Sequence, residues 1–184
     1  CGLRPGTIDQ SAAGVRERSG IQGEESNSFM GSRATEEAME EAGLSIHDID
    51  LILNASGTQE RIIPDGGPLI QRQLGMADSG LPCMSIHTTC LSFLWAFNVA
   101  AHFLCSGQYR NILIVSSDVG SRNTNPTETE SFVLFGDVGA AVVATRAGDG
   151  EASCMERYLF RTFGEGADHT CVLTGTARPP HLPD

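Results

Sequence analysis

A strand, a short turn, one cysteine and an apolar helix follow one another in the middle of this chain. The apolar run Leu81–Ile86 predicts a buried strand. Thr88, Thr89 and Cys90 form the junction, and the segment that follows, up to about Ser106, is apolar on nearly every side. Such a segment predicts a helix buried in a core. This order restricts the chain to folds in which helices cover a sheet.

Cys90 stands where the predicted helix begins. Unpaired N–H groups and the helix dipole favour a thiolate at that place, and a thiolate is a nucleophile. A buried structural cysteine is the alternative, and this stretch alone favours it. His87 raises two further alternatives, a base for Cys90 or part of a zinc site. A strand residue so close in sequence need not face the thiol, and the chain offers no further zinc ligands.

Helices and strands alternate in the rest of the chain, after a polar, Gly-rich loop at residues 1–25. The predicted helices are Ser28–Ala42, before Gly43, and Pro68–Leu74, before Gly75. The predicted strands are Ile49–Ala55, Asn111–Ser117, Ala140–Thr145 and one more within 151–163. One stripe of the first helix is expected to face the core: Phe29, Ala34, Ala38, Met39 and Ala42.

Continuous apolar strands that alternate with helices predict an α/β fold with a largely parallel sheet covered on both faces. The strands before and after the Cys90 helix are expected to lie side by side or near each other. The aromatic residues Phe93, Trp95 and Phe97 of that helix are expected in the core. Sites in such sheets gather at the C-terminal ends of strands. Because Cys90 follows one such end, its interpretation as a nucleophile gains weight.

Composition narrows the class of protein. With 12 basic and 23 acidic residues the net charge is −11, which argues against a nucleic-acid-binding protein. Six cysteines without a CxxC pair predict reduced thiols in an intracellular, cytoplasmic protein. No uninterrupted apolar run of about 18 residues is found, which predicts no membrane span. The chain begins without Met and ends in a Pro-rich stretch, so we expect a longer natural protein.

A glycine turn precedes the last predicted strand. Gly136-Asp137-Val138-Gly139 has the glycines of a nucleotide-binding loop but lacks the Gly-Lys-Ser/Thr ending and the following helix. A structural turn is the favoured interpretation, in which Asp137 bonds to nearby backbone groups.

Four segments resemble, in order and spacing, the thiolase superfamily, and within it the β-ketoacyl-acyl-carrier-protein synthase III group. They are Arg18-Ser19-Gly20-Ile21, Thr89-Cys90-Leu91-Ser92-Phe93, Ile112–Asp118 and Leu134–Ala141. The resemblance implies a thiolase-like fold of two similar halves related by a pseudo-dyad. Residues 1–184 would then be the N-terminal half-domain, with the C-terminal half absent from this chain.

The resemblance also implies a reaction. Cys90 would take an acyl group from a thioester, with its own backbone N–H as one oxyanion donor. A histidine and an asparagine of the absent half would then help a malonyl-type extender to lose carbon dioxide and attack the acyl group in a Claisen condensation. The family does not use the position of His87 as a base.

Further site residues are implied by the same resemblance. Ile63 would reach across a dimer interface and close the partner's acyl pocket, or would be an exposed loop residue. Phe135 would line the acyl pocket or pack in the core, and Leu91, in place of the usual small residue, would alter that pocket. Arg18 would contact the thioester carrier. The relatives that use coenzyme A have a tryptophan at the position of Gly14 and a second arginine near Thr129.

The sequence therefore predicts an acyltransferase of the condensing type in a specialised fatty-acid or polyketide pathway. Its substrates would be acyl-CoA or an acyl carrier protein, with no tightly bound cofactor, no metal and a homodimeric state. The loss of the tryptophan and the second arginine favours a carrier protein or another thioester over coenzyme A. Two alternatives stay open: an acyltransferase that forms an ester or amide on the same scaffold, and a non-catalytic or truncated subunit.

Overall fold

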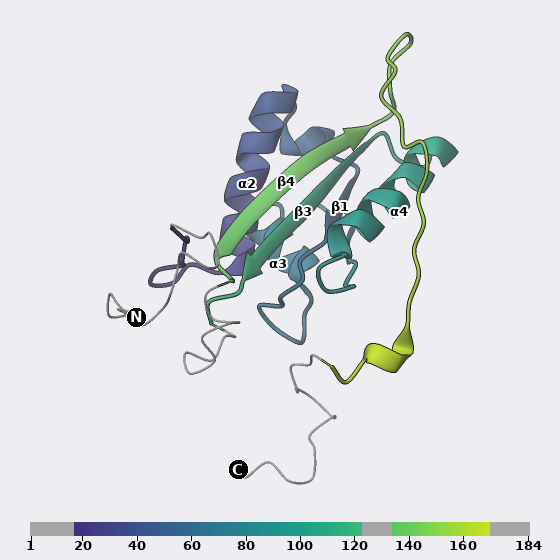
Figure 1. The fold of residues 1–184 in the computed structure, drawn as a ribbon. Coiled ribbons are helices and arrows are strands. Elements are labelled where there is room, and N and C mark those ends of the chain that lie inside the picture. The colour runs from purple at the N-terminus through teal and green to yellow at the C-terminus, as the bar shows by residue number, and fades with distance from the viewer. Residues whose placement is uncertain (1–16, 123–133, 170–184) are drawn as a thin grey trace, which may run out of the picture. The chain divides into compact units, whose positions relative to one another are not determined.

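Four strands form one mixed sheet with the spatial order β2-β1-β3-β4 (Figure 1). This computed structural model describes residues 17–122 and 134–169, and contacts divide the chain into the units Cys1–Ser153 and Cys154–Asp184. The strands, all in the first unit, are β1 (Leu51–Asn54), β2 (Cys83–Ser85), β3 (Asn111–Val119) and β4 (Asp137–Thr145). Strand β1 is parallel to both β2 and β3, whereas β4 is antiparallel to β3. The predicted α/β class and largely parallel sheet are confirmed.

The strand before Cys90 differs from its prediction. Instead of a buried strand over Leu81–Ile86, β2 has three residues at the edge of the described sheet, and none of them is fully buried. Because β1 lies between β2 and β3, the strands that flank the Cys90 helix are near each other but not adjacent.

Helices cover both faces of the sheet, as predicted (Figure 1). The helices are α2 (Asn27–Ala42), α3 (Gly66–Gln73) and α4 (Ser92–Ser106), with a short 3-10 turn η1 (Ile46–Asp48) before β1. Successive side chains of β3 point to opposite faces of the sheet. Ile112 and Ile114 pack in the cluster with α4, while Leu113 and Val115 pack in the cluster with α2 and α3.

Helix α2 begins and ends as the sequence predicts, but its buried face differs. The Ser26 hydroxyl accepts the N–H of Phe29, and Gly43 ends the helix with a φ of 64°. The apolar stripe is wrong apart from Met39, because the buried residues are Ser28, Gly31, Ser32, Thr35 and Met39. Small side chains are needed because the helix lies very close to β4. A Cβ atom on Gly139 would stand 2.7 Å from the carbonyl oxygen of Met30.

Replacing Gly139 with alanine is expected to lower the free energy of unfolding by about 1–3 kcal/mol, because the added methyl group would meet α2 backbone that cannot move alone. Urea unfolding measures the change. Gly148→Ala is the matched control, since nothing lies within 4 Å of a Cβ atom there. Equal effects of the two substitutions would show that the contact between α2 and β4 is not tight.

Helix α4 buries only one of its faces among the described residues. It ends at Gly107, which has a φ of 74°, and buries Ser92, Ala96, Asn98, Ala100 and Leu104. The prediction that its aromatic residues lie in the core is wrong for Phe97, which is exposed, while Phe93 and Trp95 are half-buried. Leu94 is also exposed. The outer side of α4 therefore presents an apolar surface.

The segment Thr89–Ser106 is long and apolar enough to cross a membrane by length and composition alone. The segment contains Asn98 and His102, so it is not the uninterrupted apolar run whose absence led the sequence to predict no membrane span. The core helix of a soluble protein has the same length and composition, however, and the finding does not establish a span.

The second unit, where described, has little regular structure. It contains a 3-10 turn, η2 (Gly164–Gly166), and a contact between the rings of Tyr158 and Phe160, whose centroids lie 5.9 Å apart. The strand predicted within 151–163 is wrong, because these described residues form no strand.

Candidate active site around Cys90

Cys90 lies in an exposed turn between β2 and α4. The N–H groups of Leu91 and Ser92 close this turn by donating to the carbonyl oxygens of Thr88 and Thr89, at 3.2 and 3.1 Å. Helix α4 begins at Ser92, two residues later than predicted. Because Cys90 is exposed, the alternative of a buried structural cysteine is wrong.

His87 is bound to a neighbouring loop. Its Nδ1 lies 3.3 Å from the carbonyl oxygen of Ser56, and no hydrogen bond joins it to Cys90 in the described structure. Within 17–122 and 134–169, no three His, Cys, Asp or Glu residues are grouped to hold a metal ion. The geometry therefore supports neither the base nor the zinc alternative for His87.

The other described cysteines differ from Cys90 in position or surroundings. Cys83, Cys90, Cys105 and Cys154 are all free thiols, as predicted, while Cys1 and Cys171 lie outside the described residues. Burial raises the pKa of the Cys83 thiol to about 11, so this thiol stays protonated near neutral pH. Cys105, although exposed, lies near the C-terminal end of α4 and not before its first turn.

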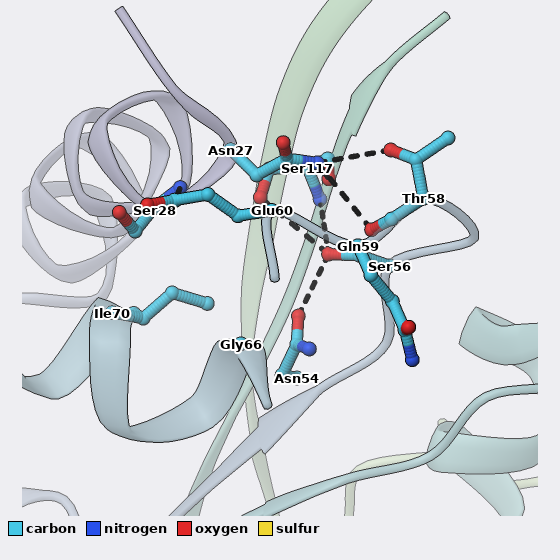
Figure 2. Close-up of a pocket in the computed structure, with 10 residues that line it drawn as sticks. All are labelled: Asn27, Ser28, Asn54, Ser56, Thr58, Gln59, Glu60, Gly66, Ile70 and Ser117. Carbon is cyan, nitrogen blue, oxygen red and sulfur yellow. Dashed lines mark hydrogen bonds between the residues drawn. The ribbon is translucent and has the colours of Figure 1, made fainter. Parts of the chain in front are cut away.

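A polar network joins the C-terminal ends of β1, β2 and β3 beside the turn. The Ser56 hydroxyl donates to Asn54 Oδ1 at 2.7 Å and accepts the N–H of Ser117 at 3.0 Å. Asn54 Nδ2 in turn donates to the hydroxyl of Ser85 at 3.1 Å. Figure 2 shows Asn54, Ser56 and Ser117 lining one polar pocket with residues from α2 and α3. None of the predicted acyl-pocket residues lines this pocket.

The loop after β1 is fixed to the end of β3. Asp118 Oδ1 accepts both the N–H and the hydroxyl of Thr58, and the same hydroxyl accepts the N–H of Val119 at 2.9 Å. Gly57, in the middle of this loop, lies against the turn of Cys90. A Cβ atom on Gly57 would be 3.2 Å from the carbonyl oxygen of Thr89.

Glu60, in the same loop, contacts the N-terminus of α2. Its Oε2 accepts the N–H of Ser28 at 3.0 Å. Burial pushes the pKa of this carboxyl up, but hydrogen bonds from Ser28 and Ser26 outweigh the burial and hold the pKa below its usual value. Glu60 is thus an ionised cap of α2 and not a free acid or base.

Asp137 bonds to nearby backbone groups, as the interpretation of its glycine turn as structural predicts. Its carboxylate accepts the N–H of Ile21 at 2.8 Å, the N–H of Ser121 at 2.8 Å and the Ser121 hydroxyl at 2.6 Å. Burial alone would raise the pKa of Asp137, but these hydrogen bonds hold it below the usual value. The strand begins at Asp137 itself, earlier than the predicted Ala140.

Arg18 and Phe135 are brought together, because Arg18 Nη1 donates to the carbonyl oxygen of Phe135 at 2.9 Å. The Phe135 side chain is 50% exposed, so the core-packing alternative is wrong. Leu91, next to Cys90, is 47% exposed, and Ile63 is 84% exposed in the loop between β1 and α3. The departures at Gly14 and Thr129 lie outside the described residues.

The sequence does not single out Ser92. The serine is buried at the first position of α4, directly after the exposed Cys90 and Leu91. A serine at the start of a predicted helix is a signal for a local hydrogen bond to the backbone. The sequence cannot show which backbone groups such a bond would join.

Comparison with known proteins places the chain. The family 3-oxoacyl-[acyl-carrier-protein (ACP)] synthase III matches residues 84–162, which include Cys90. The β-ketoacyl-[acyl-carrier-protein] synthase III of Ruegeria sp. strain TM1040 is 32% identical over 85% of this chain and 49% of its own length. The protein of that name from Aquifex aeolicus is 35% identical over 74% of this chain and 43% of its own. The chain thus spans about half the length of the curated relatives it matches, or less.

Solved structures agree. The 3-oxoacyl-[acyl-carrier-protein] synthase III of Aquifex aeolicus has a TM-score of 0.68 and 34% identity, covering 73% of this chain and 42% of that one. The corresponding Thermus thermophilus protein has a TM-score of 0.82 and covers 95% of this chain and 54% of that one. At 21% identity, the latter shows the fold alone. Together the comparisons bear out the resemblance to the N-terminal half of a synthase III-like member of the thiolase superfamily.

Proposed function

From this likeness to the N-terminal half of β-ketoacyl-acyl-carrier-protein synthase III, we propose that the whole protein is a condensing enzyme whose acyl-carrying nucleophile is Cys90. The observation that carries the proposal is the exposed thiol of Cys90, which lies between the end of a parallel strand and the start of α4. Exposure lets a thioester reach the sulfur, and the preceding strand fixes where the turn stands.

The proposed first step is a transfer between two sulfur atoms. The Cys90 thiolate attacks the thioester carbonyl, a carbon–sulfur bond to Cys90 forms, and the bond to the donor's sulfur breaks, releasing the donor as a thiolate that takes up a proton from water. The backbone N–H of Cys90 would donate to the developing oxyanion. It is not one of the amides that close the turn, because those belong to Leu91 and Ser92.

The proposed second step is the Claisen condensation. A malonyl-type thioester loses carbon dioxide, and the carbanion formed attacks the acyl carbon on Cys90. A carbon–carbon bond forms, the bond to the Cys90 sulfur breaks, and a 3-oxoacyl thioester leaves. The histidine and asparagine that assist this step in the family would come from the C-terminal half. Residues 1–184 would be the N-terminal half-domain.

The residues around the thiol would select the acyl group and its carrier. Leu91 is adjacent in sequence and Phe135 is half exposed, and both are proposed to line the acyl pocket. Ile63, in its exposed loop, is proposed to act across a homodimer interface. Arg18 is proposed to contact the carrier, acyl-CoA or an acyl carrier protein, in a cytoplasmic fatty-acid or polyketide pathway. No tightly bound cofactor, metal, nucleic acid or membrane takes part in this scheme.

Incubating the full natural protein with an acyl thioester and malonyl thioesters, carried on coenzyme A or on a carrier protein, is expected to release carbon dioxide and form a 3-oxoacyl product. Radiolabelled carbon dioxide and the product mass are the two measurements. An ester or amide formed from an added alcohol or amine, without release of carbon dioxide, would contradict condensation and show acyl transfer instead. No product of either kind from any donor would indicate a non-catalytic subunit.

A further inference from the structure

The Ser92 side chain binds the backbone of Thr88 and Thr89, the two residues directly before Cys90. Its hydroxyl accepts the N–H of Thr88 at 3.0 Å and donates to the carbonyl oxygen of Thr89 at 2.7 Å. The side chain can keep both bonds in one geometry because Ser92 is only 1% exposed. A single buried hydroxyl thus closes the turn from inside the helix.

Thr89 needs such a support. Its φ of 53° is in the left-handed region, which a β-branched residue rarely adopts because of the crowding at its Cβ. A residue keeps this conformation only when its surroundings determine it. The Ser92 hydroxyl and the Ser92 N–H both donate to the Thr89 carbonyl, and Gly57 lies against the same oxygen. The carbonyl is therefore fixed on more than one side.

Fixing this carbonyl also fixes the Cys90 amide. The Thr89 C=O and the Cys90 N–H belong to one planar peptide unit, in which they point in opposite directions. We propose that Ser92 is a positioning residue that sets the direction of the Cys90 N–H through the Thr89 carbonyl. The proposal rests on the proposed function, in which this N–H is an oxyanion donor. Ser92 itself touches neither substrate nor the reacting atoms.

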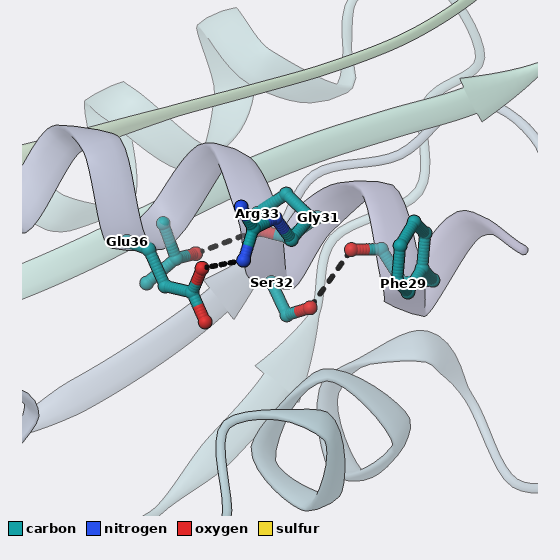
Figure 3. A network of polar contacts seen from close by, with 6 residues as sticks. Phe29, Gly31, Ser32, Arg33 and Glu36 are labelled. Atoms are coloured by element: carbon teal, nitrogen blue, oxygen red, sulfur yellow. Dashed lines mark hydrogen bonds and ion pairs between the residues drawn. The ribbon is translucent and has the colours of Figure 1, made fainter. Parts of the chain in front are cut away.

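The test compares Ser92→Ala with a matched control, Ser32→Ala, in the full natural protein. Ser32 is also a buried helix serine, and its hydroxyl donates to the carbonyl three residues earlier, Phe29, at 2.8 Å (Figure 3). Two rates are measured at Cys90 by mass spectrometry: acylation by acetyl-CoA or an acyl-carrier-protein thioester, and alkylation by iodoacetamide. Only acylation develops an oxyanion. Loss of a residue that positions the oxyanion donor therefore lowers the acylation rate more than the alkylation rate.

Ser92→Ala is expected to slow acylation about tenfold, equivalent to about 1.4 kcal/mol in the activation barrier. Alkylation is expected to stay within about twofold, a change worth less than a neutral hydrogen bond. Ser32→Ala is expected to leave both rates unchanged. An unchanged acylation rate in Ser92→Ala, or an equal loss in both reactions, would overturn the inference.

Thr89→Gly provides the second variant. Glycine adopts a positive φ without strain, so the turn keeps its shape more easily when the Ser92 hydroxyl is removed. The double variant Thr89→Gly/Ser92→Ala is expected to acylate faster than Ser92→Ala alone, and no recovery would overturn the inference. If the wild-type protein is acylated and Ser92→Ala is acylated at the same rate, this inference fails while the proposed function stands. No acylation of the wild-type protein by any donor defeats the proposed function and this inference with it.

Discussion

Replacing Cys90 with alanine is expected to abolish product formation from an acyl thioester. Removal of the nucleophile from an enzyme with covalent catalysis lowers turnover by roughly three orders of magnitude or more. Alanine has no atom that could carry the acyl group, and the exposed position of Cys90 should tolerate the smaller side chain without a large loss of stability. Initial rates of product formation by the natural protein measure the effect.

Two other thiols serve as controls for this substitution. Cys105 is exposed like Cys90 but lies at the other end of α4, so Cys105→Ala is expected to keep the wild-type rate. Cys83→Ala tests a partly buried thiol whose pKa is raised to about 11 by burial. Residual turnover of Cys90→Ala within tenfold of wild type, or a comparable loss in Cys105→Ala, would contradict the role given to Cys90.

Replacing Asp137 with alanine is expected to lower the free energy of unfolding by about 2–4 kcal/mol. Asp137 is 4% exposed as a residue, and its carboxylate accepts the N–H groups of Ile21 and Ser121 as well as the Ser121 hydroxyl. Each buried donor left without an acceptor costs about 1–3 kcal/mol, and water entering the space offsets part of the sum. Urea unfolding measures the loss. Asp149→Ala, at an exposed turn, is the control, and an equal effect of both would contradict the structural role of Asp137.

The same carboxylate makes stability depend on pH. Its pKa in the folded protein is lowered, since hydrogen bonds outweigh the opposing effect of burial. A lowered pKa contributes stability that is fully present above the unfolded value of about 3.9 and is lost as the pH falls through the folded pKa. Asp137→Asn is expected to flatten the fall in unfolding free energy below about pH 4. An unchanged slope in this variant would assign the acid sensitivity to other carboxylates, such as Asp50 and Glu60, whose pKa values are also lowered.

The order of strands and helices was accessible from the sequence because local signals mark it. Gly43 and Gly107 end α2 and α4 in the left-handed conformation that such glycines predict. The buried face of α2 was not accessible, because it depends on how closely the helix approaches β4. A Cβ atom on Gly139 in β4 would stand 2.7 Å from the Met30 carbonyl oxygen, and one on Gly31 would stand 3.0 Å from a methyl group of Val115 in β3, so small residues replace the apolar stripe that helical periodicity favours.

The candidate site also combines features that the local sequence shows with features that only the folded structure shows. The position of Cys90 between a strand and a helix can be recognised in the sequence, but its interpretation as a nucleophile comes from the predicted parallel sheet and from the family resemblance. The role proposed for Ser92 depends on the positive φ of Thr89 and on the position of Gly57, which is 32 residues away along the chain by numbering and meets the turn only in the folded protein. The apolar outer side of α4 was likewise hidden, since composition alone describes the helix as one that is buried all round.

The identity of the acylated residue tests the proposed function most directly. The natural protein is incubated with an acyl thioester, and intact mass followed by peptide mapping locates any added acyl group. The expected result is a single acyl adduct on Cys90, which is released by hydroxylamine as a thioester is and is absent from Cys90→Ala. An adduct on another residue, an adduct that persists in Cys90→Ala, or no adduct with either coenzyme A or carrier-protein donors would contradict the role of Cys90 as the acyl-carrying nucleophile.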